Sequence, residues 1–380
     1  MKEVINKNEC CGCHACYNIC PKNAIRMIED EKGFKYPVIN QDKCINCGLC
    51  KKVCPILNKK NEIKKKIEAY ACYNKKDSEI LSSSSGGIFI LLAREIIKRK
   101  GVVFGACFDK EFSVIHTYVE NEKDLKKFMG SKYTQSTIGD TYKKVKQFLE
   151  SDRYVLVTGT PCQIEGLLSY LGKEYDKLYT QDIICHGVPS PKAWKKYLDY
   201  QKNVNNDDIK KISFRDKKYG WLRYQVRIDF NKKTYNVNHD NDLYMKSFLS
   251  NICLRDSCYN CSFKKKYRIS DITLADYWGI NKQHPEFFND KGVSLVIINS
   301  DKGRELFELI SKKITYIKTE FDDAIKYNPA MISSVNHCKN EKEFIENIDS
   351  IPFNKLVNKY VPKYPLYKKI IKKMLCIIKK

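Results

Sequence analysis

The sequence predicts an α+β fold, in which a small cysteine-rich module precedes a larger α/β domain with a β-rich insertion. Three observations support this prediction. Two matching cysteine runs fall before residue 56 of the 380. Apolar strand-like and helix-like segments alternate over residues 68–200. Period-two alternation of apolar and polar residues follows over residues 205–250. At 380 residues and 43% hydrophobic content, the chain has room for two or three cores.

The two cysteine runs share one spacing, C-x2-C-x2-C-x3-C-P. The first is Cys10, Cys13, Cys16 and Cys20, and the second is Cys44, Cys47, Cys50 and Cys54. This is the spacing of two-cluster bacterial ferredoxins, in which the fourth cysteine of each run ligates the other cluster. We therefore expect one 4Fe-4S cluster on Cys10, Cys13, Cys16 and Cys54, and another on Cys44, Cys47, Cys50 and Cys20. A pair of zinc sites is the alternative, because four thiolates also suit zinc. Cys11 has no place in the pattern.

The chain is expected to divide at a charged linker, NKKNEIKKKI. Residues 1–57 form the predicted dicluster ferredoxin-type domain, 58–67 the linker, and 68–150 and 151–345 the two parts of the α/β domain. Residues 346–380 form a basic tail that ends in an amphipathic helix. That helix suits either an interfacial membrane contact or docking on its own domain.

Two polar loops in residues 68–150 are candidate cofactor sites. Ser82–Gly87 precedes an apolar helical segment, and such a loop offers free backbone N–H groups to a phosphate or other anion. A simple helix N-cap is the alternative. The second loop, Gly130–Ser136, suits a pyrophosphate or the edge of a flavin ring, or is an ordinary loop between helices.

Four further cysteines come from three separate places. Cys162 and Cys185 each follow a predicted buried strand, so parallel neighbours would bring both thiols to one crevice. Cys258 and Cys261 form a C-x2-C pair. These four make one cluster's worth of ligands and predict a third 4Fe-4S cluster. The alternatives are that Cys253 replaces one of them, that Cys162 is a redox-active thiol, or that the strand cysteines belong to the core. Cys72, Cys107, Cys338 and Cys376 are assigned to core or surface.

The net charge of +24 limits the classes of partner. It suits an acidic electron-carrier protein such as ferredoxin, an anionic substrate or an anionic membrane surface, although a lysine-rich genome would produce the same excess. No nucleic-acid-binding signature is present, so we expect no nucleic-acid partner. The first residues contain no apolar signal segment. Thiolates held for clusters favour the cytoplasm, with peripheral contact at the inner membrane surface left open.

Iron–sulfur clusters pass electrons singly, whereas most organic substrates take them in pairs. A flavin bridges the two regimes, so we expect one in the α/β domain. This expectation rests on the change from one-electron to two-electron transfer and not on a motif, because the sequence has no G-x-G-x-x-G fingerprint.

Six segments together resemble one known family. GTPCQIEGL, DIICHGVPSP, SCYNCSFK and SDITLADYWGI, with SSSSGGIF and GSKYTQS upstream, are similar to the coenzyme F-420 hydrogenase/dehydrogenase beta subunit family. The resemblance runs from about Glu68 to Asn336, and a tandem ferredoxin module is a usual companion. It implies FAD and an iron–sulfur cluster on Cys162, Cys185, Cys258 and Cys261. It also implies flavin contacts near Ser84, Gly86, Gly87, Ser131, Lys132 and Tyr133. Asp276 is a further candidate cofactor-binding residue, although Ala275 stands where the family usually has glycine.

We therefore expect an iron–sulfur flavoprotein oxidoreductase. It would pass electrons from ferredoxin through 4Fe-4S clusters to FAD and on to an organic acceptor. The acceptor is the deazaflavin coenzyme F-420 or another small molecule, and some family members accompany polysaccharide synthesis. The sequence identifies no catalytic residue. The rival hypotheses are a non-catalytic electron-transfer subunit that docks a partner enzyme, and a zinc-bearing, basic nucleic-acid-binding protein.

Overall fold

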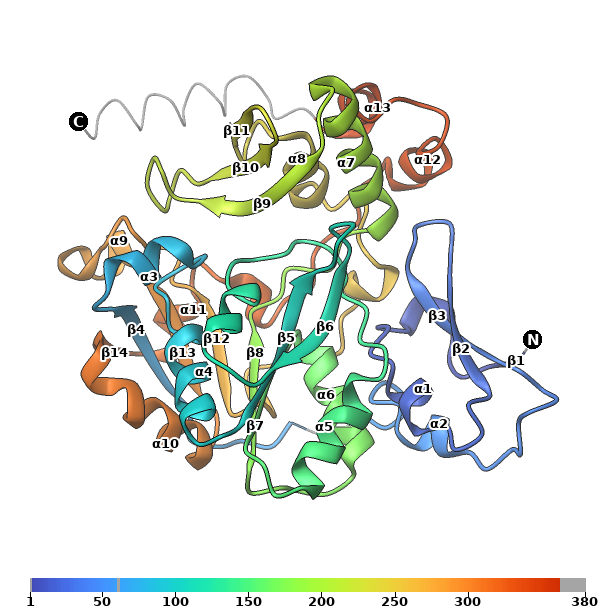
Figure 1. Cartoon of the computed structure of the whole chain (residues 1–380), viewed down its shortest axis with the longest axis horizontal. Helices are drawn as coiled ribbons and strands as arrows, with labels where there is room; N and C mark the ends of the chain where they lie inside the picture. Colours follow the sequence, from blue (N-terminus) through green and yellow to red (C-terminus); the bar gives the residue numbers. More distant parts are fainter. Residues whose placement is uncertain (1, 60–61, 363–380) are drawn as a thin grey trace.

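The computed structural model describes residues 2–59 and 62–362 and has a large mixed sheet at its centre (Figure 1). The eight strands lie in the order β14-β4-β13-β12-β8-β7-β5-β6. Their bounds are β4 Glu68–Asn74, β5 Val102–Phe108, β6 Val114–Val119, β7 Val155–Thr158, β8 Leu178–Ile183, β12 Ile272–Asp276, β13 Ser294–Ile298 and β14 Ile314–Thr319.

The middle of this sheet is parallel. β5, β7, β8 and β12 run the same way, whereas β13, β4, β14 and β6 pair antiparallel with their neighbours. β7 and β8 lie where the sequence predicts two buried strands, and they pair in parallel, which is the condition for Cys162 and Cys185 to reach one crevice. The carboxyl ends of the parallel strands therefore lie along one edge of the sheet.

Helices cover both faces of the sheet. Successive side chains of a strand point to opposite faces, so Val155 and Val157 pack with one helical layer and Leu156 with the other. The first layer contains α5 and α6, and α11 covers the same face beside it against β4 and β13. The second layer contains α4 and α10. The bounds are α4 Phe89–Lys98, α5 Thr141–Glu150, α6 Pro161–Leu171, α10 Asp301–Ile310 and α11 Phe321–Ile325, with short helices α3 Asp77–Ser82 and α9 Ile280–Gln283 nearby.

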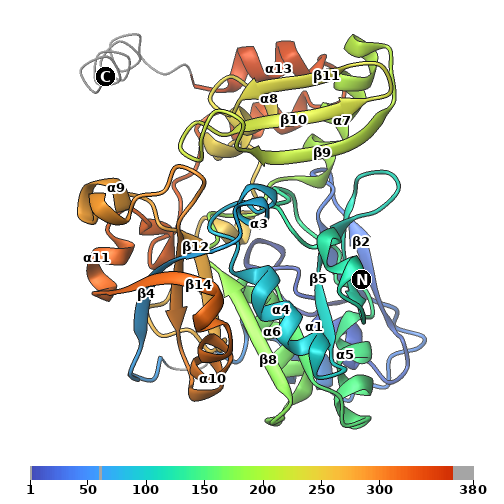
Figure 2. The same ribbon diagram turned by 60° about the vertical axis from the view of Figure 1, so that its left-hand side comes forward.

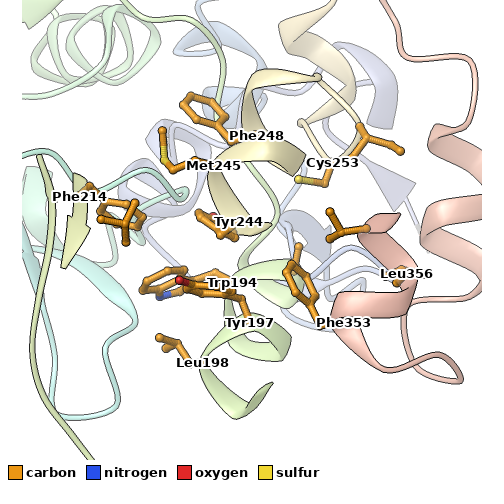
Figure 3. Close-up of a cluster of buried hydrophobic side chains, with 14 of the residues drawn as sticks. Trp194, Tyr197, Leu198, Phe214, Tyr244, Met245, Phe248, Cys253, Phe353 and Leu356 are labelled. Atoms are coloured by element: carbon orange, nitrogen blue, oxygen red, sulfur yellow. The ribbon is translucent and has the colours of Figure 1, made fainter. Parts of the chain in front are cut away.

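A separate lobe lies over one edge of the sheet in both views (Figures 1 and 2). Its antiparallel sheet, β11-β10-β9, occurs where the sequence predicts a β-rich insertion. Its core is aromatic, with Trp194, Tyr197 and Tyr244 packed together (Figure 3). The elements are α7 Pro191–Asn205, β9 Ile209–Asp216, β10 Gln225–Phe230, β11 Thr234–Asn238, α8 Leu243–Leu249, α12 Glu341–Glu346 and α13 Phe353–Tyr360.

The N-terminal module is small and lies beside the α5–α6 layer (Figure 1). It comprises β1 Lys2–Glu3, α1 Ala15–Ile19, β2 Ile25–Glu29, β3 Lys35–Ile39 and α2 Leu49–Lys52. Asn18 links the module to the sheet domain, because the Asn18 Nδ2 donates to the carbonyl oxygen of Gly139 at 2.9 Å. Lys32 adds ion pairs to Asp256 at 2.5 Å and Glu341 at 2.7 Å. The module is therefore held against both the sheet domain and the lobe.

The predicted amphipathic C-terminal helix lies outside the described residues. Among residues 2–59 and 62–362, no helix has the length and apolar character needed to cross a membrane.

Candidate iron–sulfur and cofactor sites

The first cysteine group of the N-terminal module surrounds a small buried cavity. Cys10, Cys13, Cys16 and Cys54 all line it. Burial raises the pKa of Cys16, and the neighbouring thiols of Cys10 and Cys54 raise it further. The sulfur of Cys54, from the second run, therefore lies with those of the first run.

The second group lies nearer the surface. Cys20, Cys44 and Cys50 pack against the same small hydrophobic cluster, and Cys47 is exposed. Burial raises the pKa of Cys50, to which the thiols of Cys47 and Cys20 also contribute. The fourth cysteine of each run thus lies with the first three of the other, which is the crosswise arrangement expected from the spacing.

The third group lines a second cavity. Cys162, Cys185, Cys258 and Cys261 meet there, although they come from three distant segments. Burial raises the pKa of Cys258, and the thiols of Cys185, Cys261 and Cys162 raise it further. The structure therefore brings together the four cysteines that the sequence grouped.

Cys162 is positioned by the start of α6. Thr160 and Gln163 form a capping box, and Pro161 occupies the first turn. Each of these features favours a helix beginning at this point. Gly166, one turn later, has no side chain, and a Cβ built there would lie 2.7 Å from the Cβ of Cys13. The GTPCQIEG segment thus places Cys162 and also lets the N-terminal module approach α6.

Cys185 is positioned by a loop that pairs with the segment before Cys258. The Arg255 N–H donates to the Val188 carbonyl at 3.0 Å, and the Ser190 N–H donates to the Cys253 carbonyl at 2.8 Å. The Val188 N–H donates to the Cys258 sulfur at 3.5 Å. Burial raises the pKa of Cys185 to about 12.

Cys261 is fixed from the other side of the cavity. Its N–H donates to the Ser334 hydroxyl at 2.9 Å. Lys264 donates to the carbonyls of Cys185 and Ala330, which ties the two cysteine segments together.

Cys253 lies elsewhere. It is fully buried in the aromatic core of the lobe (Figure 3) and is not among the residues that line the third cysteine cavity. Cys72, Cys107 and Cys338 are also buried in hydrophobic clusters, whereas Cys376 is outside the described residues. Among the residues that the structure describes, no three His, Cys, Asp or Glu side chains are arranged to hold a single metal ion.

A larger cleft of about 470 Å³ opens at the carboxyl ends of the parallel strands. Ligands of open α/β sheets bind at this edge, and the volume is typical of a small-molecule site. The lobe supplies the opposite wall through Arg215, Tyr224 and Phe248. Six of the seven predicted flavin contacts line the cleft, namely Ser84, Gly87, Ser131, Lys132, Tyr133 and Asp276.

The two predicted cofactor loops meet in this cleft. The Ser84 hydroxyl accepts hydrogen bonds from the N–H and hydroxyl of Ser131, at 2.7 and 2.8 Å. Gly86, the seventh predicted contact, lies behind the cleft wall, where a Cβ would come within 2.5 Å of the Cys72 carbonyl oxygen. Its small size lets the loop pack against the sheet.

Lys132 brings a positive charge to the cleft. Its ammonium donates to the carbonyls of Lys127, Met129 and Gly130 at 3.0–3.2 Å. Desolvation lowers the pKa of Lys132 to about 8. The three carbonyls are neutral, so they stabilise the ammonium without cancelling its positive charge. This charge favours an anionic neighbour.

Asp276 is occupied by protein partners. Its carboxylate accepts two hydrogen bonds from Arg215, at 2.7 and 3.0 Å, and one from the Trp221 indole at 2.7 Å. Asp276 therefore orients Arg215, which the sequence analysis missed, because nothing in the β-rich insertion marks Arg215 as part of this cleft.

Two buried polar atoms of cleft residues lack a hydrogen-bond partner within the described structure. They are the Arg215 Nε donor and the Gln181 Oε1 acceptor. Buried polar groups are usually paired. A ligand with both acceptors and donors would satisfy them, so the cleft fits a polar ring system such as that of a flavin.

A hydrogen-bonded series supports the floor of the cleft. His116 Nε2 donates to the Thr158 carbonyl at 3.0 Å, and its Nδ1 lies 2.9 Å from the Ser136 hydroxyl. Gln163 in turn donates to that hydroxyl at 2.9 Å. Burial lowers the pKa of His116 to about 4, so the ring is neutral at physiological pH. This series, which sequence spacing did not reveal, fixes the strand end that precedes Cys162.

The three hollows are neighbours. Cys11 lines both the first and the third cysteine cavities. Cys185, His186, Gly187 and Val188 line both the third cavity and the cleft. A continuous series of cysteine sites therefore leads from the N-terminal module to the cleft.

Comparisons with known proteins identify two regions of the chain. Residues 152–323 match the C terminus of the coenzyme F420 hydrogenase/dehydrogenase beta subunit, and residues 9–57 match a 4Fe-4S dicluster domain. No curated protein matches the chain. Among solved structures, one similar chain belongs to the xenon-derivatised F420-reducing [NiFe] hydrogenase complex from Methanosarcina barkeri. It is 17% identical, with 73% of this chain and 91% of that chain covered and a TM-score of 0.48.

The chain is thus an iron–sulfur protein of the oxidoreductase type. It carries an N-terminal 4Fe-4S dicluster domain, and its residues 152–323 form a domain similar to the C terminus of the coenzyme F420 hydrogenase/dehydrogenase beta subunit.

Proposed function

We propose that the chain is an iron–sulfur flavoprotein that takes electrons from a ferredoxin-like carrier and delivers them in pairs to an organic acceptor. The observation that carries this proposal is the continuous series of cysteine sites and cleft, joined by Cys11 and by residues 185–188. Two one-electron carriers are oxidised for each acceptor that gains two electrons and two protons. Coenzyme F420 or another small molecule fills the role of acceptor.

The ligand sets follow from which thiols lie together. The first cluster uses Cys10, Cys13, Cys16 and Cys54, and the second uses Cys20, Cys44, Cys47 and Cys50. The third uses Cys162, Cys185, Cys258 and Cys261. The position of Cys253 in the aromatic core favours this third set over one that includes Cys253.

The cleft is the proposed FAD site. When bound, FAD would exchange electrons singly on one side and in pairs on the other. Ser84, Gly87 and Ser131 would hold it through the joined loops, and Lys132 would supply positive charge near its phosphates. Arg215, oriented by Asp276, would offer its free Nε–H to a ring acceptor. Gly86 would act indirectly, by seating the loop.

A substitution that fills the cleft tests this assignment. Ser131→Trp places a large ring where Ser131 lines the cleft, whereas Ser151→Trp adds the same ring at the exposed end of α5. In anaerobic equilibrium dialysis with FAD, we expect Ser131→Trp to bind at least about tenfold more weakly than the wild type. Ser151→Trp should bind normally, and both variants should keep their iron.

The proposed function fails if oxygen-free reconstituted protein binds no flavin. It also fails if a reduced carrier protein transfers electrons to the clusters but no organic acceptor, deazaflavin included, is ever reduced. Reduction that appears only after a partner enzyme is added would identify an electron-transfer subunit instead.

A further inference from the structure

Arg255 lies buried at the junction between the N-terminal module and the sheet domain. Only 1% of its surface is exposed. Its Nε donates to the Cys10 carbonyl at 2.7 Å, one terminal nitrogen to Gln135 Oε1 at 2.7 Å, and the other to the Lys35 carbonyl at 3.1 Å. All three acceptors are neutral, so these hydrogen bonds position the guanidinium without balancing its charge.

The other deeply buried arginines have carboxylate partners. Arg215 pairs with Asp276 at 2.7 Å, and Arg268 pairs with Asp182 at 3.4 Å. Within residues 2–59 and 62–362, no carboxylate forms an ion pair with Arg255. A buried charge without a counter-charge is strongly destabilising. Arg255 therefore needs a negative neighbour other than a carboxylate.

The guanidinium lies over aromatic rings and beside segments that carry proposed cluster ligands. Cys10 belongs to the first proposed cluster, and Cys258 belongs to the third. Arg255 contacts both, because its Nε donates to the Cys10 carbonyl and its own carbonyl accepts from the Cys258 N–H at 2.8 Å. The guanidinium also lies over the Tyr36 ring, 4.1 Å from its centroid. It thus stands between the ligands of two different cysteine groups.

The loop around Gly12 makes room for this placement. Gly12 has a φ of +67°, and a Cβ there would lie 2.8 Å from both a terminal nitrogen of Arg255 and Nε2 of Gln135. A side chain at residue 12 would push the guanidinium away from Cys10. The glycine inside the first cysteine run therefore serves the junction as well as the turn.

We propose that Arg255 is the shared counter-charge of the first and third iron–sulfur clusters and raises the reduction potential of both. A cubane held by four thiolates is negatively charged, and reduction by one electron adds to that charge. A fixed buried cation therefore stabilises the reduced form, because net charge and hydrogen bonding set cluster potentials. The second cluster, on Cys20, Cys44, Cys47 and Cys50, has no contact with Arg255. This inference rests on the proposed function for the third cluster only.

The test is an anaerobic redox titration of the clusters, followed by electron paramagnetic resonance. Removing the charge in Arg255→Gln should make reduction of the first and third clusters at least about tenfold less favourable. A tenfold change corresponds to 59 mV for a one-electron couple. The second cluster should keep its potential. Arg153→Gln removes the same charge at an exposed pair with Glu120 and should change none of the three.

Arg255→Lys separates charge from hydrogen bonding. Lysine keeps the positive charge but loses the planar fork of the guanidinium. The equilibrium constant for reduction of each of the two clusters should therefore stay within about threefold of the wild-type value. If Arg255→Gln fails to retain its clusters, the potentials of Arg255→Lys still test the proposal.

Three results would overturn the proposal. One is unchanged potentials in Arg255→Gln with all clusters present. The second is an equal shift in the reduction potential of the second cluster. The third is a tenfold or greater drop in the equilibrium constant for reduction of the first or third cluster in Arg255→Lys, with its clusters retained. If wild-type protein lacks a third cluster, the proposed function fails, yet the effect of Arg255 on the first cluster can still be measured.

Discussion

At the scale of single residues, neutral polar contacts and glycines position the candidate site. His116 is a clear case, because the Thr158 carbonyl can only accept a hydrogen bond, which places the ring proton on Nε2. Nδ1 is then left to accept from Ser136. Protonating this buried ring would add a charge with no carboxylate partner among its described contacts.

The pH dependence of stability follows from that arrangement. The pKa of His116 is about 4 in the folded chain, against 6.5 for an ordinary histidine. Between these values the unfolded chain binds more protons, so stability falls as the pH drops from 6.5 towards 4. We expect about 2 kcal/mol to be lost between pH 7 and pH 5 from this group. Anaerobic urea unfolding of the wild type and His116→Gln at both pH values measures it, and an identical pH dependence in the two proteins would contradict it.

Gly166 gives a second prediction at this scale. Gly166→Ala forces a methyl against Cys13, and overpacking of this kind costs about 1–3 kcal/mol. Since Cys13 is a proposed ligand, the first cluster should also be lost or altered in its spectrum. Gly172→Ala serves as the control. Gly172 lies at the end of the same helix with a φ of +69°, and a Cβ there would meet no neighbouring atom. It should cost about 1 kcal/mol and leave the iron content unchanged. A Gly166→Ala protein with wild-type stability and spectrum would show that Cys13 does not pack on α6 in this way.

At the scale of elements, α2 is the exposed end of the cysteine series. It carries Lys51 and Lys52, both exposed, directly after Cys50. Ile45 is 57% exposed next to Cys44. An apolar residue beside basic ones suits an acidic carrier protein, because complementary charge accelerates docking.

Reversing the charge on α2 should slow electron uptake. We expect Lys51→Glu/Lys52→Glu to lower the second-order rate constant for reduction by an acidic carrier by about tenfold at low salt. The difference should shrink as the salt concentration rises. Stopped-flow spectroscopy measures this, with Lys232→Glu/Lys233→Glu on the exposed β10–β11 turn as the matched control. Equal slowing in both double variants would mean that net charge, rather than α2, controls docking.

The sequence allowed the elements to be predicted better than the contacts between them. β7 and β8 are predicted as strands from their sequence, and Cys162 and Cys185 follow their carboxyl ends. Arg255 could not be identified in this way, since its role depends on how the N-terminal module docks. Spacing also could not separate Cys253 from Cys258, because both belong to one C-x4-C-x2-C run. Only the packing of Cys253 among the lobe aromatics distinguishes them.

At the scale of the whole molecule, the module, the sheet domain and the lobe meet around the third cysteine cavity. Lys32 joins the module to the lobe. Arg255 joins the module to the loop before Cys258, and Tyr244 of the lobe donates to the Tyr133 carbonyl in the cleft wall at 2.6 Å. The third cysteine cavity and the cleft are thus assembled from parts that are far apart in the sequence.

In the proposed function, a third 4Fe-4S cluster would link the N-terminal module to the cleft. The most direct test of this cluster is to measure iron and acid-labile sulfide in anaerobically reconstituted protein. The wild type is compared with Cys162→Ser. Three cubane clusters predict about twelve irons per chain for the wild type and about eight for the variant, with the module's two cluster signals intact. About eight irons in both proteins would contradict the account.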